Sequence, residues 1–413
     1  MQERFLTEFQ KRGYFSQCTD EIGLDGLMSK TKIKAYIGFD CTAPSLHVGS
    51  LMQIMCLRLL QKYGHQPIVL LGGGTTLIGD PSGKEETRKI LSKREIEKNI
   101  KSIENVFKIF LKTNNSKTKP IFVNNYTWLS KLNYINFLRE IGKHFTVNKM
   151  LTFDSVKLRL EREQSLSYME FNYMMLQAYD FYELNKRHKC VLQIGGSDQW
   201  GNIVNGTDLI RRKEKKQTYG LTTPLLTLSS GVKMGKTEKG AVWLNKKMLS
   251  PYDYWQFWRN TDDKDVLNFI KLFTDLDLGE IEELEKNNKD INKLKILLAN
   301  KTTAMLHGLK DAKEAELTAQ KTFGDKSMGK NLPILKVKKS IILSGLNLLD
   351  LVLQTKLANS KSEIRRMIKN NGLKINNEVV ADESKIINQN NFDLNNNMKI
   401  SHGKKQHVIV KII

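Results

Sequence analysis

The chain has 413 residues, of which 40% are hydrophobic and 27% charged, with only seven prolines. This is the composition of a folded protein of several domains, and it excludes a disordered chain or a small disulfide-bonded scaffold. The 66 Lys and Arg against 44 Asp and Glu give a net charge of +22, which favours a phosphate-rich polyanion as partner. The alternative is that the excess of Lys only reflects a general bias in amino-acid composition and serves no partner.

The N-terminal segment carries charges such as Glu3, Arg4 and Glu8 and has no long apolar core, so no export signal is predicted. No apolar stretch in the chain reaches the roughly 18 residues that a membrane-spanning helix needs. The four cysteines are far apart and form no C-x-x-C pair, so neither a zinc site nor a disulfide framework is predicted. These features predict a cytoplasmic protein that is not bound to a membrane.

Between residues 33 and 240, short β-rich runs alternate with helical patterns, as in a parallel sheet with covering helices. An amphipathic helix is predicted from Ser45 to Gly64. Strands are predicted at residues 33–39, 68–71, 121–124 and 190–194. Because each strand is followed by Gly, Asn or Asp, polar residues gather at the strand C-termini, where open α/β sheets bind their ligands.

The pattern changes after about residue 246. Aromatic residues and then amphipathic segments predict an all-helical domain over residues 246–322. Residues 323–345 mix Gly, Lys and Pro without a period and are predicted to be a linker. Residues 346–413 predict two helices followed by short strands, and residues 331–413 hold 14 Lys and Arg against 6 Asp and Glu. This last domain is therefore basic.

Two glycine-rich stretches lack the spacing of common nucleotide motifs. Between Gly79 and Gly83 there are three residues where a P-loop needs four, and Glu85 follows Lys84. The run 72–74 does not form G-x-G-x-x-G. A nucleotide site in this chain is therefore of another kind.

One candidate site lies where the first strand leads into a helix. His47 and Gly49 fall in the first helical turn, where free N–H groups and the positive end of the helix dipole favour phosphate. The missing side chain of Gly49 lets a base or ribose approach closely. The alternative is a simple capping turn with an exposed histidine.

A second candidate lies in the Met- and aromatic-rich segment 168–184. Tyr173, Gln177 and Asp180 stand at i, i+4 and i+7, on one face of a predicted buried helix. Buried polar groups need partners. These three side chains are predicted to hold a small polar ligand, with an internal polar network as the alternative.

Two further segments combine glycines with side chains suited to a nucleotide. In the first, Gly195 and Gly196 join a strand to a helix, and Asp198 is placed to accept a ribose hydroxyl unless it is only an N-cap. In the second, a glycine-rich loop carries Lys233 and Lys236. That loop could close on a triphosphate and neutralise charge as pyrophosphate leaves, unless it is merely a solvated basic loop.

Taken in order, these motifs resemble the bacterial-type tyrosyl-tRNA synthetases, which are class I aminoacyl-tRNA synthetases. Residues 47–50 (HVGS) resemble the HIGH signature, and residues 233–237 (KMGKT) resemble the KMSKS signature. More specific for tyrosine are Tyr36-x-Gly38-x-Asp40, the face of Tyr173, Gln177 and Asp180, and residues 193–201 (QIGGSDQWG). Residues 349–380 resemble the alpha-L RNA-binding fold of this family.

The resemblance implies an α/β fold with a Rossmann-like parallel-sheet catalytic domain over residues 1–245, including a dimer-interface insertion near 125–160. An α-helical anticodon-side domain (246–322), the linker (323–345) and an alpha-L type RNA-binding domain (346–413) would follow. The implied reaction converts L-tyrosine and ATP to tyrosyl-adenylate and pyrophosphate, and then transfers tyrosine to the 3′ end of tRNA(Tyr). Mg²⁺ is expected with ATP, no zinc is expected, and the enzyme would be a cytoplasmic homodimer.

The resemblance also assigns roles to residues. The tyrosine-binding residues would be Tyr36, Asp80, Tyr173, Gln177, Asp180 and Gln193. The ATP-binding residues would be Gly38, Asp40, His47, Gly49, Ser50, Gly196, Asp198, Gln199 and Lys236. The catalytic residues, at the pyrophosphoryl end, would be Thr42, His47, Lys84, Arg88, Lys233, Lys236 and Thr237. Asn125 and Trp128 resemble residues that line the same cleft.

Two positions depart from the family pattern. The last histidine of HIGH is Ser50, and the cysteine common after the first tyrosine is Ile37. Because Ile37 cannot hydrogen-bond, altered affinity for ATP is predicted. Two other functions stay open. One is a tryptophanyl-tRNA synthetase, although an Asp180 carboxylate opposite the Tyr36 hydroxyl suits a phenol better than an indole. The other is an RNA-binding protein that has lost the adenylation activity.

Overall fold

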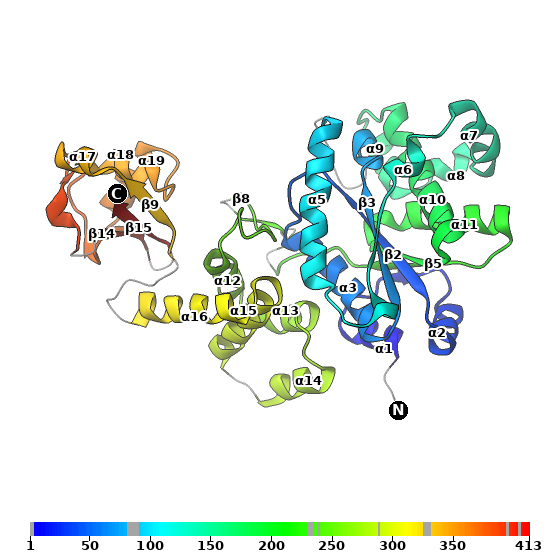
Figure 1. Cartoon of the computed structure of the whole chain (residues 1–413), viewed down its shortest axis with the longest axis horizontal. Coiled ribbons are helices and arrows are strands. Elements are labelled where there is room, and N and C mark those ends of the chain that lie inside the picture. The colour runs from blue at the N-terminus through cyan, green and yellow to red at the C-terminus, as the bar shows by residue number, and fades with distance from the viewer. Residues whose placement is uncertain are drawn as a thin grey trace. The chain divides into compact units, whose positions relative to one another are not determined.

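A computed structural model describes residues 4–80, 91–229, 231, 234–237, 240–287, 290–324, 332–393, 396–403 and 406–413. The chain forms two compact units (Figure 1). The first comprises Met1–Leu249 and Phe257–Leu306, and the second comprises Ser250–Gln256 and His307–Ile413. The segment predicted as one helical domain, 246–322, is thus divided between the two units.

The first unit is built on a sheet whose strand order is β1-β6-β5-β2-β3-β4. Its strands are β1 (Gln17–Cys18), β2 (Lys34–Asp40), β3 (Gln66–Gly72), β4 (Ile121–Asn124), β5 (Cys190–Gly196) and β6 (Tyr219–Thr223). All neighbours pair in parallel except β1, which is antiparallel to β6. The chain winds from β2 to β4 in one direction and then returns to β5 on the other side of β2. The switch point between β2 and β5 is where such sheets bind ligands.

Helices cover both faces of this sheet (Figure 1). The helices α3 (Leu51–Lys62) and α5 (Lys93–Phe110) lie on one face, and α10 (Tyr168–His188) and α11 (Trp200–Glu214) on the other. Side chains alternate along β2: Tyr36 packs on Phe181 of α10 with ring centroids 5.3 Å apart, and Phe39 packs on Phe107 of α5 at 4.7 Å. Tyr36 and its neighbour Ile37 therefore face opposite sides of the sheet.

Shorter elements complete the first unit. Near its N-terminus and cleft they are α1 (Phe5–Lys11), α2 (Glu21–Lys30), α4 (Thr75–Ile78), β7 (Lys236–Thr237) and β8 (Gly240–Ala241). The segment 125–160 holds α6 (Tyr126–Leu129), α7 (Tyr134–Glu140), α8 (Val147–Leu151) and α9 (Asp154–Glu161). The helices α13 (Val266–Phe273), α14 (Leu278–Asn287) and α15 (Ile291–His307) follow, whereas most of α12 (Pro251–Arg259) and all of α16 (Leu309–Gly324) belong to the second unit.

The helix expected to start at Ser45 begins later. A 3-10 turn at Val48–Ser50 precedes α3, which begins at Leu51. The reason is a backbone bridge to a distant segment: Val48 N–H donates to the carbonyl of Val242 at 2.9 Å, and Leu244 N–H donates to Leu46 at 2.9 Å. These bonds hold Leu46 and His47 outside the helix and fix Val48 as the start of the 3-10 turn. The strands β1 and β6, which the sequence pattern did not predict, also depend on such distant pairing.

The second unit contains a sheet of order β12-β11-β14-β15-β9 and a small pair, β10-β13. Its strands are β9 (Ile334–Val337), β10 (Leu346–Asn347), β11 (Leu373–Ile375), β12 (Glu378–Val379), β13 (Ile386–Ile387), β14 (Asn397–His402) and β15 (Gln406–Ile412). Its helices include α17 (Lys339–Leu343), α18 (Leu348–Gln354) and α19 (Lys361–Lys369). Residues 323–345 were predicted to be a linker, but this stretch contains the strand β9, which pairs in parallel with β15, and the helix α17.

The helix α19 is amphipathic. Ile364, Met367 and Ile368 are buried in the core of the second unit. Lys361, Arg365 and Lys369, predicted to share one face, are exposed. No described helix of either unit is long and apolar enough to span a membrane.

Candidate active site

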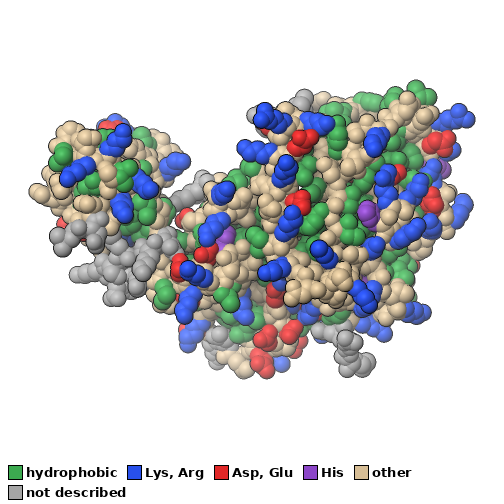
Figure 2. Space-filling model, viewed as in Figure 1, with side chains coloured by type: hydrophobic (Ala, Val, Ile, Leu, Met, Phe, Trp, Pro, Cys, Tyr) green, Lys and Arg blue, Asp and Glu red, His purple; other side chains and the backbone are tan. Residues whose placement is uncertain are grey.

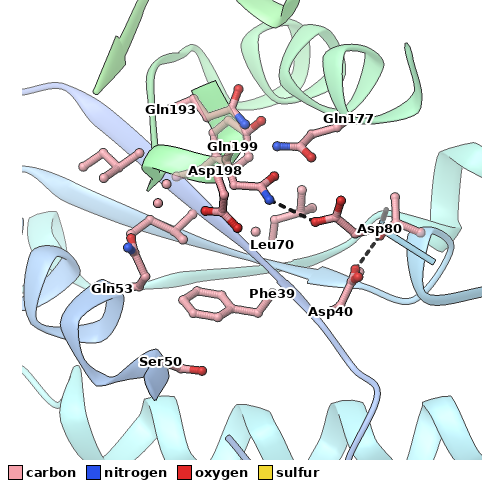
Figure 3. Close-up of a pocket in the computed structure, with 18 of the residues that line it drawn as sticks. Phe39, Asp40, Ser50, Gln53, Leu70, Asp80, Gln177, Gln193, Asp198 and Gln199 are labelled. Atoms are coloured by element: carbon pink, nitrogen blue, oxygen red, sulfur yellow. Dashed lines mark hydrogen bonds between the residues drawn. The ribbon is translucent and has the colours of Figure 1, made fainter. Parts of the chain in front are cut away.

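A cavity of about 340 Å³ lies at the switch point, at the C-terminal ends of β2 and β5 (Figure 3). It brings together residues from β2, α3, α10, β5 and the 3-10 turn Ser197–Gln199 that precedes α11. The predicted site residues that line it are Tyr36, Gly38, Asp40, Gly49, Ser50, Asp80, Tyr173, Gln177, Asp180, Gln193, Gly196, Asp198 and Gln199. Asn125 lines it as well.

The deepest carboxylate in this cleft is Asp180, which is 1% exposed. Asn125 Nδ2 donates to Asp180 Oδ2 at 2.9 Å, and Trp128 Nε1 donates to Oδ1 at 2.7 Å. Burial raises the pKa of Asp180 to about 7, and the two hydrogen bonds oppose that rise because they favour the charged form. A carboxylate held in this way is a specific acceptor for a buried hydroxyl donor.

Three other buried atoms of cleft-lining residues lack a partner among the described residues: the Tyr36 hydroxyl and the side-chain oxygens of Gln53 and Gln193. Burial and the charge of Asp180 raise the pKa of Tyr36 well above its ordinary value, so Tyr36 stays a neutral phenol. An unpaired buried polar atom costs about 1 to 3 kcal/mol. All three residues line the cavity, so a polar ligand that reaches these atoms could satisfy them.

A chain of amides connects Asp80 to Gln177. Gln199 Nε2 donates to Asp80 Oδ2 at 3.0 Å, and Asn202 Nδ2 donates to the side-chain oxygens of both Gln199 and Gln177 at 3.0 Å. Figure 3 shows the bond between Gln199 and Asp80. Asn202 was not predicted as a site residue; its position three residues after Gln199, on the same helical face, is the signal that could have identified it.

Asp40 forms a second polar cluster at the end of β2. The hydroxyl of Tyr173 donates to Asp40 Oδ1 at 3.4 Å, and that of Thr75 donates to the same oxygen at 3.2 Å. Asn125 Nδ2 also donates to Thr75 Oγ1 at 3.0 Å. Asp40, predicted on the nucleotide side, is thus joined to the predicted amino-acid residue Tyr173. Thr75 is a further residue that the sequence motifs did not single out.

The two signature-like segments lie against each other. His47 Nδ1 accepts from the N–H of Gly49 at 3.0 Å, so the side chain caps the 3-10 turn. A Cβ on Gly49 would lie 2.6 Å from His47 Cε1 and 2.9 Å from the Met234 carbonyl oxygen, so this close approach needs glycine. Gly235 follows with φ +134°, a conformation that side chains rarely adopt. The resulting contact joins the HVGS turn to the KMGKT segment.

The remaining predicted residues are less enclosed. Asp198 and Thr42 are exposed, and the His47 ring packs edge-on against Trp243 at 6.3 Å. Lys84, Arg88 and Lys233 lie outside the described residues. For Lys236 and Thr237 the structure describes the strand β7 but not the side chains.

Comparison with known proteins agrees with a class I synthetase site. The family model described as tRNA synthetases class I (W and Y) matches residues 28–324. The model of the tyrosine–tRNA ligase SYY-like C-terminal domain matches residues 326–410. The fold and the cleft therefore define a class I tRNA synthetase of the tryptophan and tyrosine group.

Individual relatives show which family of this class the chain belongs to. The tyrosine–tRNA ligase of Pelagibacter ubique (strain HTCC1062) is 65% identical over 99% of this chain and 100% of its own length. That of Rickettsia rickettsii (strain Sheila Smith) is 52% identical over the same shares. A C-terminally truncated mitochondrial tyrosyl-tRNA synthetase of Aspergillus nidulans superposes with TM-score 0.70 and 28% identity, covering 78% of this chain and 95% of that structure. The chain belongs to the tyrosine–tRNA ligase family.

Proposed function

We propose that this chain activates L-tyrosine with ATP, forming tyrosyl-adenylate and pyrophosphate, and then transfers tyrosine to the 3′ end of tRNA(Tyr). The observation that carries the proposal is the buried Asp180, which is fixed by Asn125 and Trp128 and lies in the cleft wall with the unpartnered hydroxyl of Tyr36. A phenol hydroxyl can donate to Asp180 and accept from Tyr36. The side chains of phenylalanine and tryptophan lack that combination of donor and acceptor.

The amino-acid backbone of the substrate would bind nearer the mouth of the cleft. Tyr173, Gln177 and Asp80 would hold the ammonium group, and Gln193 with its unpartnered oxygen would form the adjacent wall. The amide chain through Gln199 and Asn202 would keep Asp80 and Gln177 in place before substrate arrives. Such preorganisation lowers the cost of orienting the substrate.

The nucleotide would bind across the opposite part of the cleft. Gly38, Gly49, Ser50, Gly196 and Asp198 line the cavity and are proposed to form that region. Asp40 and Gln199 also line the cleft and would contact the nucleotide from its amino-acid side.

In the first step the tyrosine carboxylate attacks the α-phosphate of ATP, and pyrophosphate leaves. No side chain has to act as a nucleophile, so the protein contributes positioning and charge stabilisation. We assign that stabilisation to the pyrophosphoryl end, where Thr42, His47, Lys84, Arg88, Lys233, Lys236 and Thr237 are proposed to act.

Mg²⁺ is proposed to accompany ATP. Among the described residues there is no group of three or more His, Cys, Asp and Glu that could hold a metal ion. The ion would therefore be bound through phosphate oxygens and water, as is common for Mg²⁺ with nucleotides. It would neutralise phosphate charge, and no residue of this chain is assigned to it.

The test of this function is amino-acid-dependent exchange of labelled pyrophosphate into ATP, without tRNA, with tyrosine, phenylalanine and tryptophan compared in parallel. Exchange with tyrosine alone is expected. Exchange with tryptophan instead would contradict the assignment of Asp180 and Tyr36 to a phenol. If none of the three supports exchange, the chain would be a tRNA-binding protein with an inactive cleft.

We also propose that two copies associate through the segment around Gly142 to Leu151. Val147 and Leu151 of α8 are exposed apolar side chains, as are Tyr134 and Ile135 of the neighbouring α7. An apolar surface of this kind often marks a protein interface. Sedimentation should give a dimer at micromolar concentration, and a monomer there would count against this interface.

The basic second unit is proposed to bind the tRNA backbone, while the helical residues from about 247 to 322 face the anticodon end. Lys361, Arg365 and Lys369 are exposed on α19, and Lys and Arg side chains are spread over the visible face of the molecule (Figure 2). Replacing these three residues with Ala should weaken tRNA binding and flatten its salt dependence, because fewer counterions are released. Pyrophosphate exchange should be unchanged in that variant. We also propose that the enzyme acts in the cytoplasm.

A further inference from the structure

Asp265 is a buried carboxylate at the start of α13 that does not line the cleft and has no part in the proposed function so far. It is 8% exposed and occupies the N-cap position of that helix. An aspartate at an N-cap ordinarily accepts a hydrogen bond from one of the first backbone N–H groups of its own helix. The side chain of Asp265 accepts none of them. Asp265 therefore gives up the usual stabilisation of a helix cap in favour of another partner.

That partner is Ser229, 36 residues earlier in the chain. The N–H of Ser229 donates to both oxygens of Asp265, at 3.2 and 3.1 Å, and the Ser229 hydroxyl donates to Oδ2 at 3.0 Å. Hydrogen bonds to a carboxylate are stronger than those between neutral groups. Ser229 itself is exposed, so packing does little to hold it and the Asp265 carboxylate is its anchor.

Ser229 lies in a loop that leads directly into the KMGKT segment. Met234 N–H donates to the carbonyl of Leu226 at 3.1 Å, which joins the two ends of this loop. Within the loop, Gly231 N–H donates to the carbonyl of Leu228 at 2.8 Å, and this bond spans Ser229. Asp265 therefore holds the loop at a point between its two hydrogen-bonded ends.

The far end of the loop lies against the HVGS turn. A Cβ on Gly49 would lie 2.9 Å from the Met234 carbonyl oxygen, and a Cβ on Gly235 would lie 3.0 Å from His47 Cε1. These approaches leave no room for a shift toward the turn, and a shift away from it would separate two segments that are proposed to act together on the pyrophosphoryl end of ATP. Because no side chain serves as a nucleophile, the reaction depends on such positioning.

We propose that Asp265 is a positioning residue for adenylation, whose carboxylate anchors Ser229 and thereby holds the KMGKT segment against the HVGS turn. This inference rests on the proposed function, because it requires that these two segments act on ATP. It gives α13, which has no residue in the wall of the cleft, a part in the chemical step.

The test compares Asp265→Ala with the wild type as full-length chains, in pyrophosphate exchange and in equilibrium binding of tyrosine without ATP. The kcat of exchange should fall about tenfold or more, the range of a hydrogen bond to a charged group. The dissociation constant for tyrosine should stay unchanged, because Asp265 does not line the cleft. Asp265→Asn keeps an acceptor for the Ser229 N–H and should recover most of the lost kcat.

Asp262→Ala is the matched control. Asp262 lies in the same connection before α13, and its Oδ1 accepts from the N–H of Lys264 at 3.0 Å. It therefore makes a local hydrogen bond of the kind that Asp265 forgoes. This variant should leave the kcat of exchange and the binding of tyrosine unchanged.

The partner is tested by a double-mutant cycle. Ser229→Ala removes the hydroxyl donor alone and should lower kcat about two- to fivefold, near the range of a single weaker hydrogen bond. Added to Asp265→Ala, it should cause no further loss, because the acceptor is already gone. A further loss of the same size would show that the two residues act independently and would overturn the inference.

The outcomes separate this inference from the proposed function. If the wild type exchanges with tyrosine and Asp265→Ala keeps the wild-type kcat, the role of Asp265 is overturned and the enzyme function stands. If Asp265→Ala loses kcat and tyrosine binding by the same factor, the defect is general and the positioning role is likewise overturned. If the wild type supports no exchange, both are overturned.

If Asp265→Ala proves unstable in thermal unfolding, the Asp265→Asn background replaces it in the cycle. There Ser229→Ala should lower kcat by a smaller factor than in the wild type, because a hydrogen bond to a neutral amide is weaker than one to a carboxylate. Equal factors in the two backgrounds would overturn the inference.

Discussion

The two ends of the cleft are built differently. At the proposed phenol end, Asp180 is fully buried and both of its oxygens are held by side chains, Asn125 Nδ2 and Trp128 Nε1. At the proposed nucleotide end, Asp198 is exposed. Each end keeps one buried oxygen without a partner among the described residues, that of Tyr36 or of Gln53, but only the first has its carboxylate held in place by buried protein donors.

This difference follows from what each end must distinguish. Tyrosine and phenylalanine differ by one hydroxyl, so selection depends on buried polar groups that phenylalanine would leave unpaired. ATP offers many polar groups, so its binding can be spread over several weaker contacts. Changes at the phenol end should therefore have large and specific effects, and changes at the nucleotide end should have small ones.

The largest effect is expected for Asp180→Ala. Without the carboxylate, the phenol hydroxyl loses its acceptor, and phenylalanine no longer leaves a charged group unsatisfied. The preference for tyrosine over phenylalanine in kcat/KM should fall by about 10² or more; tyrosyl-tRNA synthetases as a class are the standard example of such selection, at about 10⁵. A variant that keeps full discrimination in pyrophosphate exchange would contradict the role of Asp180.

A smaller loss of tyrosine affinity is expected for Trp128→Phe, which removes one hydrogen-bond donor to Asp180 but keeps an aromatic ring. A hydrogen bond to a charged group is worth about 1.5 to 3 kcal/mol, so the KM for tyrosine should rise about tenfold or more, with the KM for ATP unchanged. The matched control is Trp258→Phe, because Trp258 is buried against Phe269 and Phe273 outside the cleft. Equal effects of the two variants on tyrosine would show that the indole N–H of Trp128 has no special role.

The pH dependence of tyrosine binding should report the state of Asp180. Its raised pKa of about 7 means that the carboxyl is mostly protonated at pH 6 and mostly ionised at pH 8. The phenol donates to the ionised form, so tyrosine affinity should rise with pH through about 7, by up to about tenfold between these values. Phenylalanine affinity should show no such rise. Calorimetry should detect proton release on tyrosine binding at pH 6 and little at pH 8.5; its absence at pH 6 would contradict a raised pKa.

Much of the phenol end was predictable because its residues follow local rules. Helical periodicity placed Tyr173, Gln177 and Asp180 on one face, and all three line the cavity. Tyr36 and Gln193 were assigned through the family resemblance, and both line the same cavity. The helical inference needs only the spacing of residues within one element.

The residues that were missed depend on contacts between distant segments. Thr223 is brought to Gln53 by the strand β6, which pairs with β5, and no local pattern predicted that strand. The late start of α3 results from the bridge of residues 46–48 to residues 242–244. Spacing along the chain carries no information about such pairings, so the nucleotide end could be recognised by motif but its hydrogen bonds could not.

The smallest effect is expected for Ile37→Cys, at the nucleotide end. Ile37 lines the cavity but is only 2% exposed, so its side chain contributes mainly packing. A thiol at this position could donate a weak hydrogen bond to a ribose oxygen, and the KM for ATP should therefore fall about threefold, near the lower range of a neutral hydrogen bond. Tyrosine KM should not change, because Ile37 and Tyr36 face opposite sides of the sheet. An unchanged KM for ATP would remove the prediction and would indicate that Ile37 does not reach the nucleotide.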